Sequence, residues 1–295
     1  MNGSNNQLAG SAARSGSPIG IICGAGSLPF AVADAAIRQG RNVVLFALRG
    51  WADPGRTESY PHHWIRIGQL GRLWRIARRE GCRDVVFIGS VVRPAFWQIW
   101  PDLATMRLLP RIIRMFRGGD DHLMSSVMKV FEDHGFRPVG AHEVAPEILM
   151  PEGAVGRCQP SESQQGDIAL GLALLRAIGA FDVGQAAIVA ENHVLAVEAA
   201  EGTDEMLAQL AELRRKGRIR SSGGVLVKAP KPGQDRRIDL PTIGPKTVAG
   251  AARAGLAGIA VVAGEAIMAE PERVAQAADH ERIFIVGVRQ DPGAR

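Results

Sequence analysis

Apolar residues in the first half of the chain form short runs that alternate with segments of helical spacing. Continuous apolar runs at 19–23, 42–48 and 84–90 predict buried strands. The segments 28–39 and 71–81 have apolar residues at helical spacing, and glycine marks the end of each helix. This alternation is typical of a parallel sheet with helices on its faces. The first half is therefore predicted to be a Rossmann-like domain.

Two more helices, at 103–117 and 120–134, and a last strand at 137–143 complete this domain, whose predicted span is 18–147. The segment 148–165 contains prolines and glycines and is predicted to be an interdomain linker.

The remaining residues, 166–295, are predicted to be a distinct C-terminal α/β domain that carries the catalytic site. It opens with an apolar helix at 167–179. Two β-type runs then flank Glu191, Asn192 and His193, which predicts a hairpin. The pattern further predicts helices at 205–216 and 246–255 and strands at 223–230, 258–264 and 282–288. The order of these strands does not follow from the pattern.

Composition places the chain among ordinary globular proteins, with 46% hydrophobic and 22% charged residues in 295. Residues 1–17 are rich in Gly, Ser and Asn, lack the apolar run of a secretory signal, and are predicted to be a disordered leader. The three cysteines, Cys23, Cys82 and Cys158, are too far apart for a disulfide framework or a zinc knuckle, which fits a reducing cytoplasm. Cys23 and Cys82 adjoin apolar runs and are predicted to be buried.

The net charge of +5 fits a protein that meets phosphates or an anionic membrane face, and it equally fits an ordinary soluble enzyme. No nucleic-acid-binding module is recognisable, so no nucleic-acid partner is expected. No apolar segment is long enough to span a bilayer, so any contact with a membrane is expected to be peripheral. The basic and aromatic segments 73–79 and 96–116 are candidates for that contact, but core helices are the favoured interpretation.

A glycine turn follows the first predicted strand and opens a helix, an arrangement that suits a phosphate. Gly24 and Gly26 begin a dinucleotide fingerprint, but Pro29 stands where its third glycine belongs. The second strand ends at Arg49 without a carboxylate, and the first one is Asp53. These departures weigh against an NAD(P)-dependent oxidoreductase. A phosphate role and a tight turn that touches no ligand both stay open.

Four other polar residues are weaker candidates. Arg93 lies where the third strand ends, the edge at which open α/β sheets bind ligands, although it is equally a surface arginine. Asp120 and Asp121 stand at a helix start, where capping is favoured over binding a metal or a sugar hydroxyl. His142 ends a strand, and a lone histidine is more often structural.

The stretch 226–247 is the most unusual, because it sets basic residues among prolines and glycines between a strand and a helix. Its cations suit a pyrophosphate, although surface charges on a structural loop are the alternative; they are Lys228, Lys231, Arg236, Arg237 and Lys246. Asp239, within this positive field, suits a metal ligand or a base for water. Upstream, 197–205 carries carboxylates that suit Mg²⁺ or a solvated face, with Thr203 or Asp204 as a helix cap.

Seven strings carry a resemblance to a known family: GAGSLP, GSVVRP, GDDHLM, GAHE, LAVEAAEGTDEML, VKAPKP and RIDLPTIGPKTV. In this order they resemble the UDP-2,3-diacylglucosamine pyrophosphatases of the lipid A pathway, in the form typical of alphaproteobacteria. The resemblance covers residue 18 to the C-terminus. It implies a Mg²⁺-dependent hydrolase that cleaves the substrate with water into UMP and 2,3-diacylglucosamine 1-phosphate, and that forms a homodimer in the cytoplasm.

The resemblance matches the essential aspartate of the family to Asp239, the predicted catalytic residue. Together, the patterns and the resemblance predict these substrate-binding residues: Gly24, Gly26, Leu28, Pro29, Arg93, Asp121, His142, Thr203, Lys228, Lys231, Arg237 and Thr242. The predicted metal ligands are Asp239, Glu198, Glu201 and Asp204. A non-catalytic nucleotide or lipid carrier is the alternative function.

Overall fold

A computed structural model describes residues 16–91, 99–115, 120–181 and 183–289. Nearly all of the predicted leader lies outside these ranges. The chain divides into two compact units, one of Met1–Leu109 with Lys129–Val139 and one of Pro110–Met128 with Gly140–Arg295. Each unit is described by itself.

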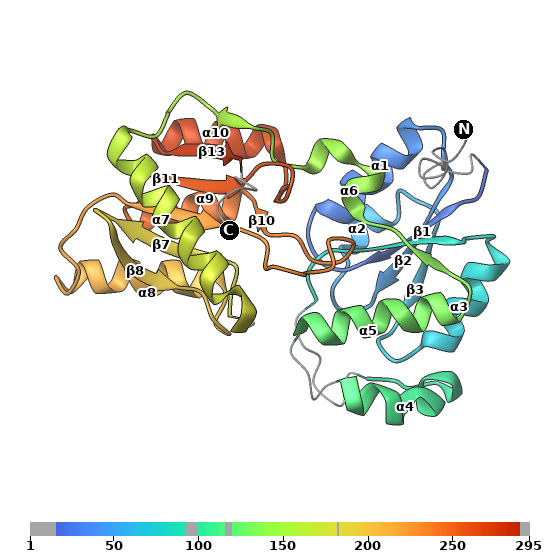
Figure 1. The fold of residues 1–295 in the computed structure, drawn as a ribbon. Helices are drawn as coiled ribbons and strands as arrows, with labels where there is room; N and C mark the ends of the chain where they lie inside the picture. Colours follow the sequence, from blue (N-terminus) through green and yellow to red (C-terminus); the bar gives the residue numbers. More distant parts are fainter. Residues whose placement is uncertain (1–15, 92–98, 116–119, 182, 290–295) are drawn as a thin grey trace, which may run out of the picture. The chain divides into compact units, whose positions relative to one another are not determined.

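The first unit contains a five-stranded parallel sheet in the order β3-β2-β1-β4-β5 (Figure 1). This is the order of a Rossmann-like sheet and confirms the predicted class of this half. The strands are β1 Ile19–Cys23, β2 Val43–Leu48, β3 His62–Ile65, β4 Asp84–Ile88 and β5 Arg137–Pro138.

Helices belong to this half as well, and buried apolar residues of the first, third and fifth complete the core of the sheet. They are α1 Leu28–Arg38, α2 Pro54–Thr57, α3 Leu70–Arg79, α4 Leu103–Met115 and α5 Asp120–Asp133. In α3, Leu73, Trp74 and Ala77 are buried. The Trp74 ring meets the Phe131 ring of α5 edge-on at 5.9 Å, and Phe131 meets Phe87 of β4 at 4.9 Å. The segment 73–79 is therefore part of a core helix, as favoured from the sequence.

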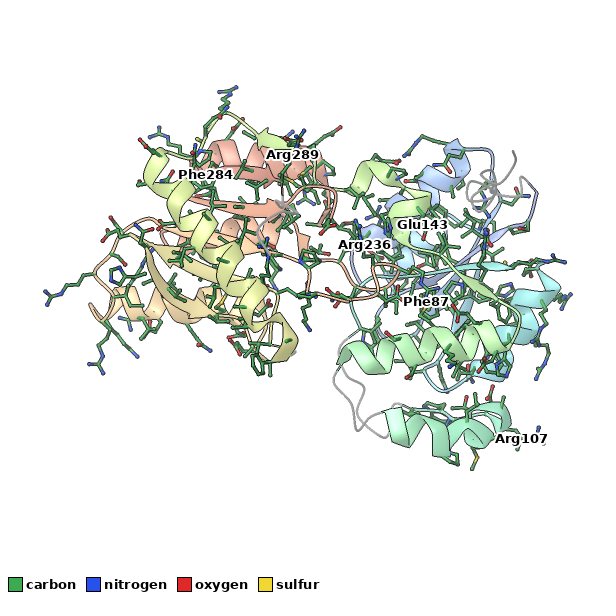
Figure 2. All side chains as sticks on the ribbon, viewed as in Figure 1. Phe87, Arg107, Glu143, Arg236, Phe284 and Arg289 are labelled. Carbon is green, nitrogen blue, oxygen red and sulfur yellow. The ribbon has the colours of Figure 1, made fainter. Side chains whose placement is uncertain are left out.

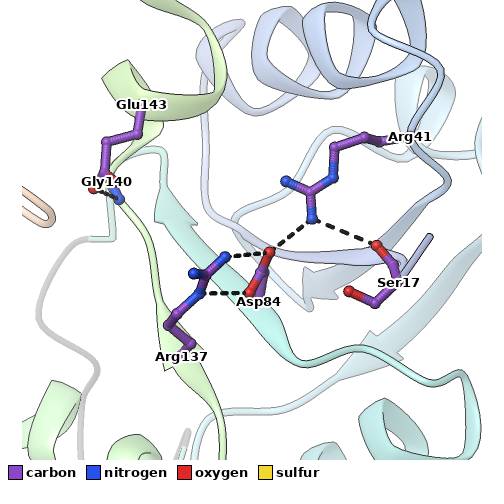
Figure 3. Close-up of polar contacts among 6 residues, drawn as sticks. All are labelled: Ser17, Arg41, Asp84, Arg137, Gly140 and Glu143. Carbon is purple, nitrogen blue, oxygen red and sulfur yellow. Dashed lines mark hydrogen bonds and ion pairs between the residues drawn. The ribbon is translucent and has the colours of Figure 1, made fainter. Parts of the chain in front are cut away.

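Two elements of this half differ from the prediction. Strand β3 was not predicted, because its four residues at the sheet edge are mostly half-buried and lack an apolar run. The predicted strand 137–143 is wrong beyond Pro138, because α6 Ala141–Val144 follows instead. There the Glu143 carboxylate accepts a hydrogen bond of 2.8 Å from the Gly140 amide, which satisfies a backbone donor at the helix start (Figure 3).

A buried ion network ties the strands together at the end where they begin (Figure 3). Asp84 opens β4 and accepts hydrogen bonds from Arg41 Nη2 at 2.7 Å and from Arg137 Nε at 2.8 Å. Burial raises the pKa of Asp84, but hydrogen bonds from both arginines outweigh it and the pKa lies below its usual value. Ligands of such sheets bind at the opposite edge, so this network serves stability.

The second unit contains a six-stranded mixed sheet in the order β6-β13-β11-β9-β7-β8. Strands β9, β11 and β13 are parallel, β6 and β7 run antiparallel to their neighbours in this set, and β8 runs antiparallel to β7. The strands are β6 Gly153–Val155, β7 Ala186–Ala190, β8 His193–Val197, β9 Val225–Lys228, β11 Gly258–Val262 and β13 Phe284–Val288. A separate parallel pair joins β10 Thr242–Ile243 to β12 Ile267–Met268.

Helices cover both faces of this sheet, which explains why its strands read as unbroken apolar runs. Leu226 of β9 packs with residues of α8, α9 and α10, whereas Val225 and Val227 face the side of α7. The helices are α7 Glu162–Ile178, α8 Thr203–Arg215, α9 Pro245–Arg253 and α10 Pro271–Glu281, with 3₁₀ turns η2 Pro146–Ile148 and η3 Gly179–Phe181.

The predicted hairpin is confirmed as β7 and β8. Its turn residues Glu191 and Asn192 have φ of 54° and 60°, the geometry of a tight two-residue turn. The segment 148–165, expected to be a linker, contains β6, which pairs with β13, and the first turn of α7. None of the helices in the described ranges has the length and apolar character needed to cross a bilayer.

Candidate active site

Three polar residues meet at one edge of the second sheet because of strand direction. Lys228 is the last residue of β9 and pairs with Ala186, the first residue of antiparallel β7. Gln185 directly precedes β7, and Glu198 directly follows β8, whose end returns to the same edge. This is the edge at which the parallel strands end, where open α/β sheets place their ligands.

Lys228 is the buried cation of this edge, with 7% of its surface exposed. Its Nζ donates to Thr203 Oγ1 at 2.9 Å and to the Thr242 carbonyl at 3.2 Å. Burial lowers the pKa of Lys228 below its usual value, and the nearby carboxylates, Glu198 first, act in the opposite direction. Hydrogen-bond partners of this kind stabilise a buried ammonium group.

Thr203 links this lysine to a carboxylate. Its hydroxyl donates to Glu198 Oε1 at 2.7 Å while accepting the bond from Lys228. The expectation that Thr203 or Asp204 caps α8 is wrong, because both residues lie inside the helix and Gly202 occupies the cap position. The Thr203 side chain instead connects Lys228 to Glu198 through hydrogen bonds.

Asp239 is held by two amide side chains. Its Oδ2 accepts from Gln185 Nε2 at 3.0 Å and from Gln234 Nε2. The backbone amide of Gln185 also donates to Glu198 Oε2 at 2.9 Å, so one residue contacts both carboxylates. We call the connected set Lys228, Thr203, Glu198, Gln185, Asp239 and Gln234 the polar chain.

The polar chain also depends on a glycine. Gly184 donates its amide to the Glu198 carbonyl at 2.9 Å, and a Cβ at this position would lie 2.4 Å from that oxygen. Gln185 and Gln234 were not predicted from the sequence. The available signal was their position, since Gln185 directly precedes an apolar strand and Gln234 lies in the basic loop.

Two arginines of the basic loop, the part of 226–247 that follows β9, form ion pairs with nearby carboxylates. Arg237 pairs with Asp235 at 2.7 Å, and hydrogen bonding by Arg237 holds the pKa of Asp235 below its usual value. Arg236 pairs with Glu265 at 3.3 Å. The backbone amide of Lys231 donates to the Gln234 side chain at 3.1 Å, which helps to shape the loop.

The four predicted metal ligands do not form one cluster. Glu198 and Asp239 belong to the polar chain, whereas Asp204 pairs with Lys246 at 2.6 Å and Glu201 accepts from the Ala199 amide at 3.2 Å. In the ranges that the structure describes, no three His, Cys, Asp or Glu side chains come together as a metal site. Mg²⁺ commonly takes only one or two protein carboxylates and completes its shell with substrate phosphates and water. Glu198 and Asp239 fit that requirement.

The glycine turn of the first unit is explained by packing. The Gly24 amide donates to the Ile88 carbonyl at 2.9 Å, and a Cβ on Gly24 would lie 2.7 Å from the Gly89 carbonyl oxygen. The adjacent Ala25 and Ser90 exchange backbone bonds of 2.8 and 3.0 Å. This tight pairing requires a glycine at position 24, and the substrate-binding roles of Gly24, Gly26, Leu28 and Pro29 stay predictions.

The rest of the turn has local roles as well. Gly26 has a φ of 99°, which favours glycine, and Leu28 and Pro29 open α1. Asp53 caps α2 and accepts a bond of 2.9 Å from the Gly55 amide, so it is engaged away from any ribose. These contacts strengthen the case against a dinucleotide fingerprint.

The weaker candidates are Arg93, Asp121 and His142. Arg93 and the side chain of Asp121 lie outside the described part of the structure. His142 lies in the first turn of α6, and its buried Nδ1 has no hydrogen-bond partner among the described residues. Burial lowers the pKa of His142. The binding roles of these three residues stay predictions.

The cysteines take no part in this chemistry. Cys23 and Cys82 are buried, as predicted, and all three cysteines are free thiols. Burial raises the pKa of Cys23 to about 11 and that of Cys82 to about 12, which makes both thiols unreactive.

The fold and the polar chain together define a class: two-domain α/β proteins in which a Rossmann-like unit precedes a mixed-sheet unit with a lysine–carboxylate site. Two family models match the sequence, the LpxI N-terminal domain over residues 18–148 and the LpxI C-terminal domain over residues 151–286. The chain is also 44% identical over 279 residues to the UDP-2,3-diacylglucosamine pyrophosphatase LpxI of Caulobacter vibrioides, covering 94% of this chain and 99% of that protein. The chain belongs to the LpxI family.

Proposed function

We propose that this protein is a hydrolase of lipid A biosynthesis that cleaves the pyrophosphate of UDP-2,3-diacylglucosamine. Water adds to one phosphorus, the bridging P–O bond breaks, and UMP and 2,3-diacylglucosamine 1-phosphate leave. The similarity to the Caulobacter relative supports the substrate, because it extends over nearly the whole of both chains. The observation that carries the chemistry is the clamping of Asp239 by Gln185 and Gln234.

Asp239 is the catalytic carboxylate in this proposal. Two amide donors on one oxygen fix its orientation. An ionised, oriented carboxylate suits either a metal ligand or a base that takes a proton from water. Lys228 supports the arrangement through Thr203, because its ammonium donates to the Thr203 hydroxyl, which in turn donates to Glu198.

Mg²⁺ is part of the proposal, with Asp239 and Glu198 as the protein ligands. When bound, the ion would neutralise charge on the phosphates and orient them. The protein's own contribution is positioning. Thr203 and Gln185 hold Glu198 through its two oxygens, so both proposed ligands have fixed orientations.

The test is UMP release from UDP-2,3-diacylglucosamine in detergent, with Mg²⁺ or with EDTA. Asp239→Asn should lower turnover by about a hundredfold or more, the usual loss for a group that acts in proton transfer. Asp235→Asn is the matched control, since it changes a carboxylate of the same loop that pairs with Arg237. Its effect should stay within about fivefold, because this ion pair is only half-buried and Asp235 does not belong to the polar chain.

The outcomes separate the candidate functions. Full turnover in Asp239→Asn would remove the assigned role. Tight binding of the substrate without UMP release by the native protein would point to the carrier instead. A homodimer, a cytoplasmic location and peripheral contact with the inner membrane belong to the same proposal, and sedimentation of the purified protein tests the first of them.

A further inference from the structure

Three large apolar side chains stand exposed together at the start of α4. Trp100, Leu103 and Met106 are 55%, 66% and 55% exposed. They are three residues apart, and Leu103 and Met106 share one side of the helix. Other exposed apolar side chains, such as Ile37 and Phe181, are isolated from this set in the sequence. A group of this kind marks an interaction surface.

The helix start that presents these side chains is firmly anchored. The Asp102 carboxylate accepts a hydrogen bond of 2.9 Å from the Thr105 amide and so caps α4. It also accepts a hydrogen bond of 2.9 Å from the Arg72 amide at the start of α3. The buried Thr105 hydroxyl donates to the Gly68 carbonyl and accepts from the Leu70 amide at 3.2 Å. The exposed side chains are therefore presented by a fixed backbone.

The surroundings of these side chains are basic. The Arg66 guanidinium lies over the Trp100 ring, 4.5 Å from its centre, and Arg107 follows Met106 on α4 (Figure 2). Arg66, Arg72 and Arg107 are all exposed. Asp102 is the one acidic residue in 66–72 and 99–107, and backbone amides occupy its carboxylate. We call Trp100, Leu103 and Met106 with these three arginines the α4 patch.

We propose that the α4 patch docks the protein on an anionic lipid surface. This inference rests on the proposed function, because a diacylated substrate resides in a membrane. Tryptophan and leucine enter the headgroup boundary of a bilayer, and arginine pairs with lipid phosphates. A second copy of this patch is a poorer partner, since a symmetric contact would set arginines against arginines. Charge complementarity therefore favours anionic lipid as the occupant.

The experiment is co-sedimentation of the full chain with phosphatidylcholine vesicles, with or without roughly 30% phosphatidylglycerol. The native chain should pellet with the anionic vesicles and should be released by salt. Leu103→Glu with Met106→Glu should weaken binding by at least about tenfold, the equivalent of one buried leucine side chain. Arg107→Gln should weaken it by about fivefold.

Matched controls keep the test specific. Ile37→Glu adds a charge at an apolar side chain of the same unit that is 48% exposed, and Arg83→Gln removes an exposed arginine from outside the patch. Both should bind vesicles like the native chain. All variants should release UMP from detergent-dispersed substrate at native rates, which separates vesicle docking from the proposed hydrolysis.

Three results would overturn the proposal. The native chain could fail to bind either vesicle, or the double variant could bind as well as the native chain. The double variant could also change the mass of the protein in solution, which would make the patch a contact between copies. Absence of UMP release by the native chain in detergent would contradict the proposed function, while vesicle binding would still report on the patch.

Discussion

Gln185→Ala is the sharpest test of the polar chain, because it removes one side-chain donor and keeps the backbone. The lost bond is the 3.0 Å contact from Gln185 Nε2 to Asp239, whereas the backbone bond from residue 185 to Glu198 remains. A hydrogen bond to a charged group contributes about 1.5–3 kcal/mol. If Asp239 needs its present orientation in the transition state, turnover should fall by roughly 10- to 150-fold.

The assay is UMP release under saturating substrate, with circular dichroism to check that the variant is folded. Gln164→Ala is the control, since Gln164 likewise uses its amide group locally, at the start of α7. It should release UMP at the native rate. Native turnover in a folded Gln185→Ala protein would refute the role of the polar chain.

Three more predictions follow from buried contacts. Asp84→Ala leaves Arg41 without its carboxylate partner and should lower the free energy of unfolding in urea by roughly 3 kcal/mol. The pKa of Asp84 in the folded protein lies below its ordinary 3.8. The difference in stability between the native protein and the variant should therefore be complete above pH 3.8 and should shrink as the pH falls through the folded pKa. Gly24→Ala should lower the melting temperature through its clash with Gly89, yet the soluble protein should keep UMP release. Lys228→Met should abolish most turnover while circular dichroism shows a folded protein; native turnover would show that the buried charge is dispensable.

Much of the fold could be predicted because its central strands are buried on both faces. Strands β1, β2 and β4 are unbroken apolar runs, and the hairpin of β7 and β8 carries its turn residues in the sequence. Two short edge strands, β3 and β6, were not predicted, since they have three or four residues and little burial. Helix α10 was missed as well, although Pro271 stands in its first turn, where proline is common.

The charged residues of the candidate site could be predicted from the sequence, whereas its uncharged residues could not. Asp239, Lys228 and Glu198 stand in unusual charged strings, and the structure brings them into one connected set. Gln185 and Gln234 have no charge, and a glutamine gives no sign in the sequence of which oxygen it will meet. The close spacing of Glu198, Glu201 and Asp204 in the sequence suggested that their carboxylates would form one cluster. Glu201 and Asp204 instead contact other groups.

The direction of β7 is what makes the site possible. In an all-parallel sheet, only residues that follow strands would reach the ligand edge. Because β7 runs antiparallel to β9, the residue that precedes it, Gln185, stands beside the end of β9 at Lys228. The hairpin then returns β8 to the same edge and delivers Glu198. A lysine, an amide and a carboxylate thus converge from three neighbouring strands, and the basic loop after β9 needs to supply only Asp239 and Gln234. The antiparallel hairpin therefore gathers the residues of the proposed site as well as completing the sheet.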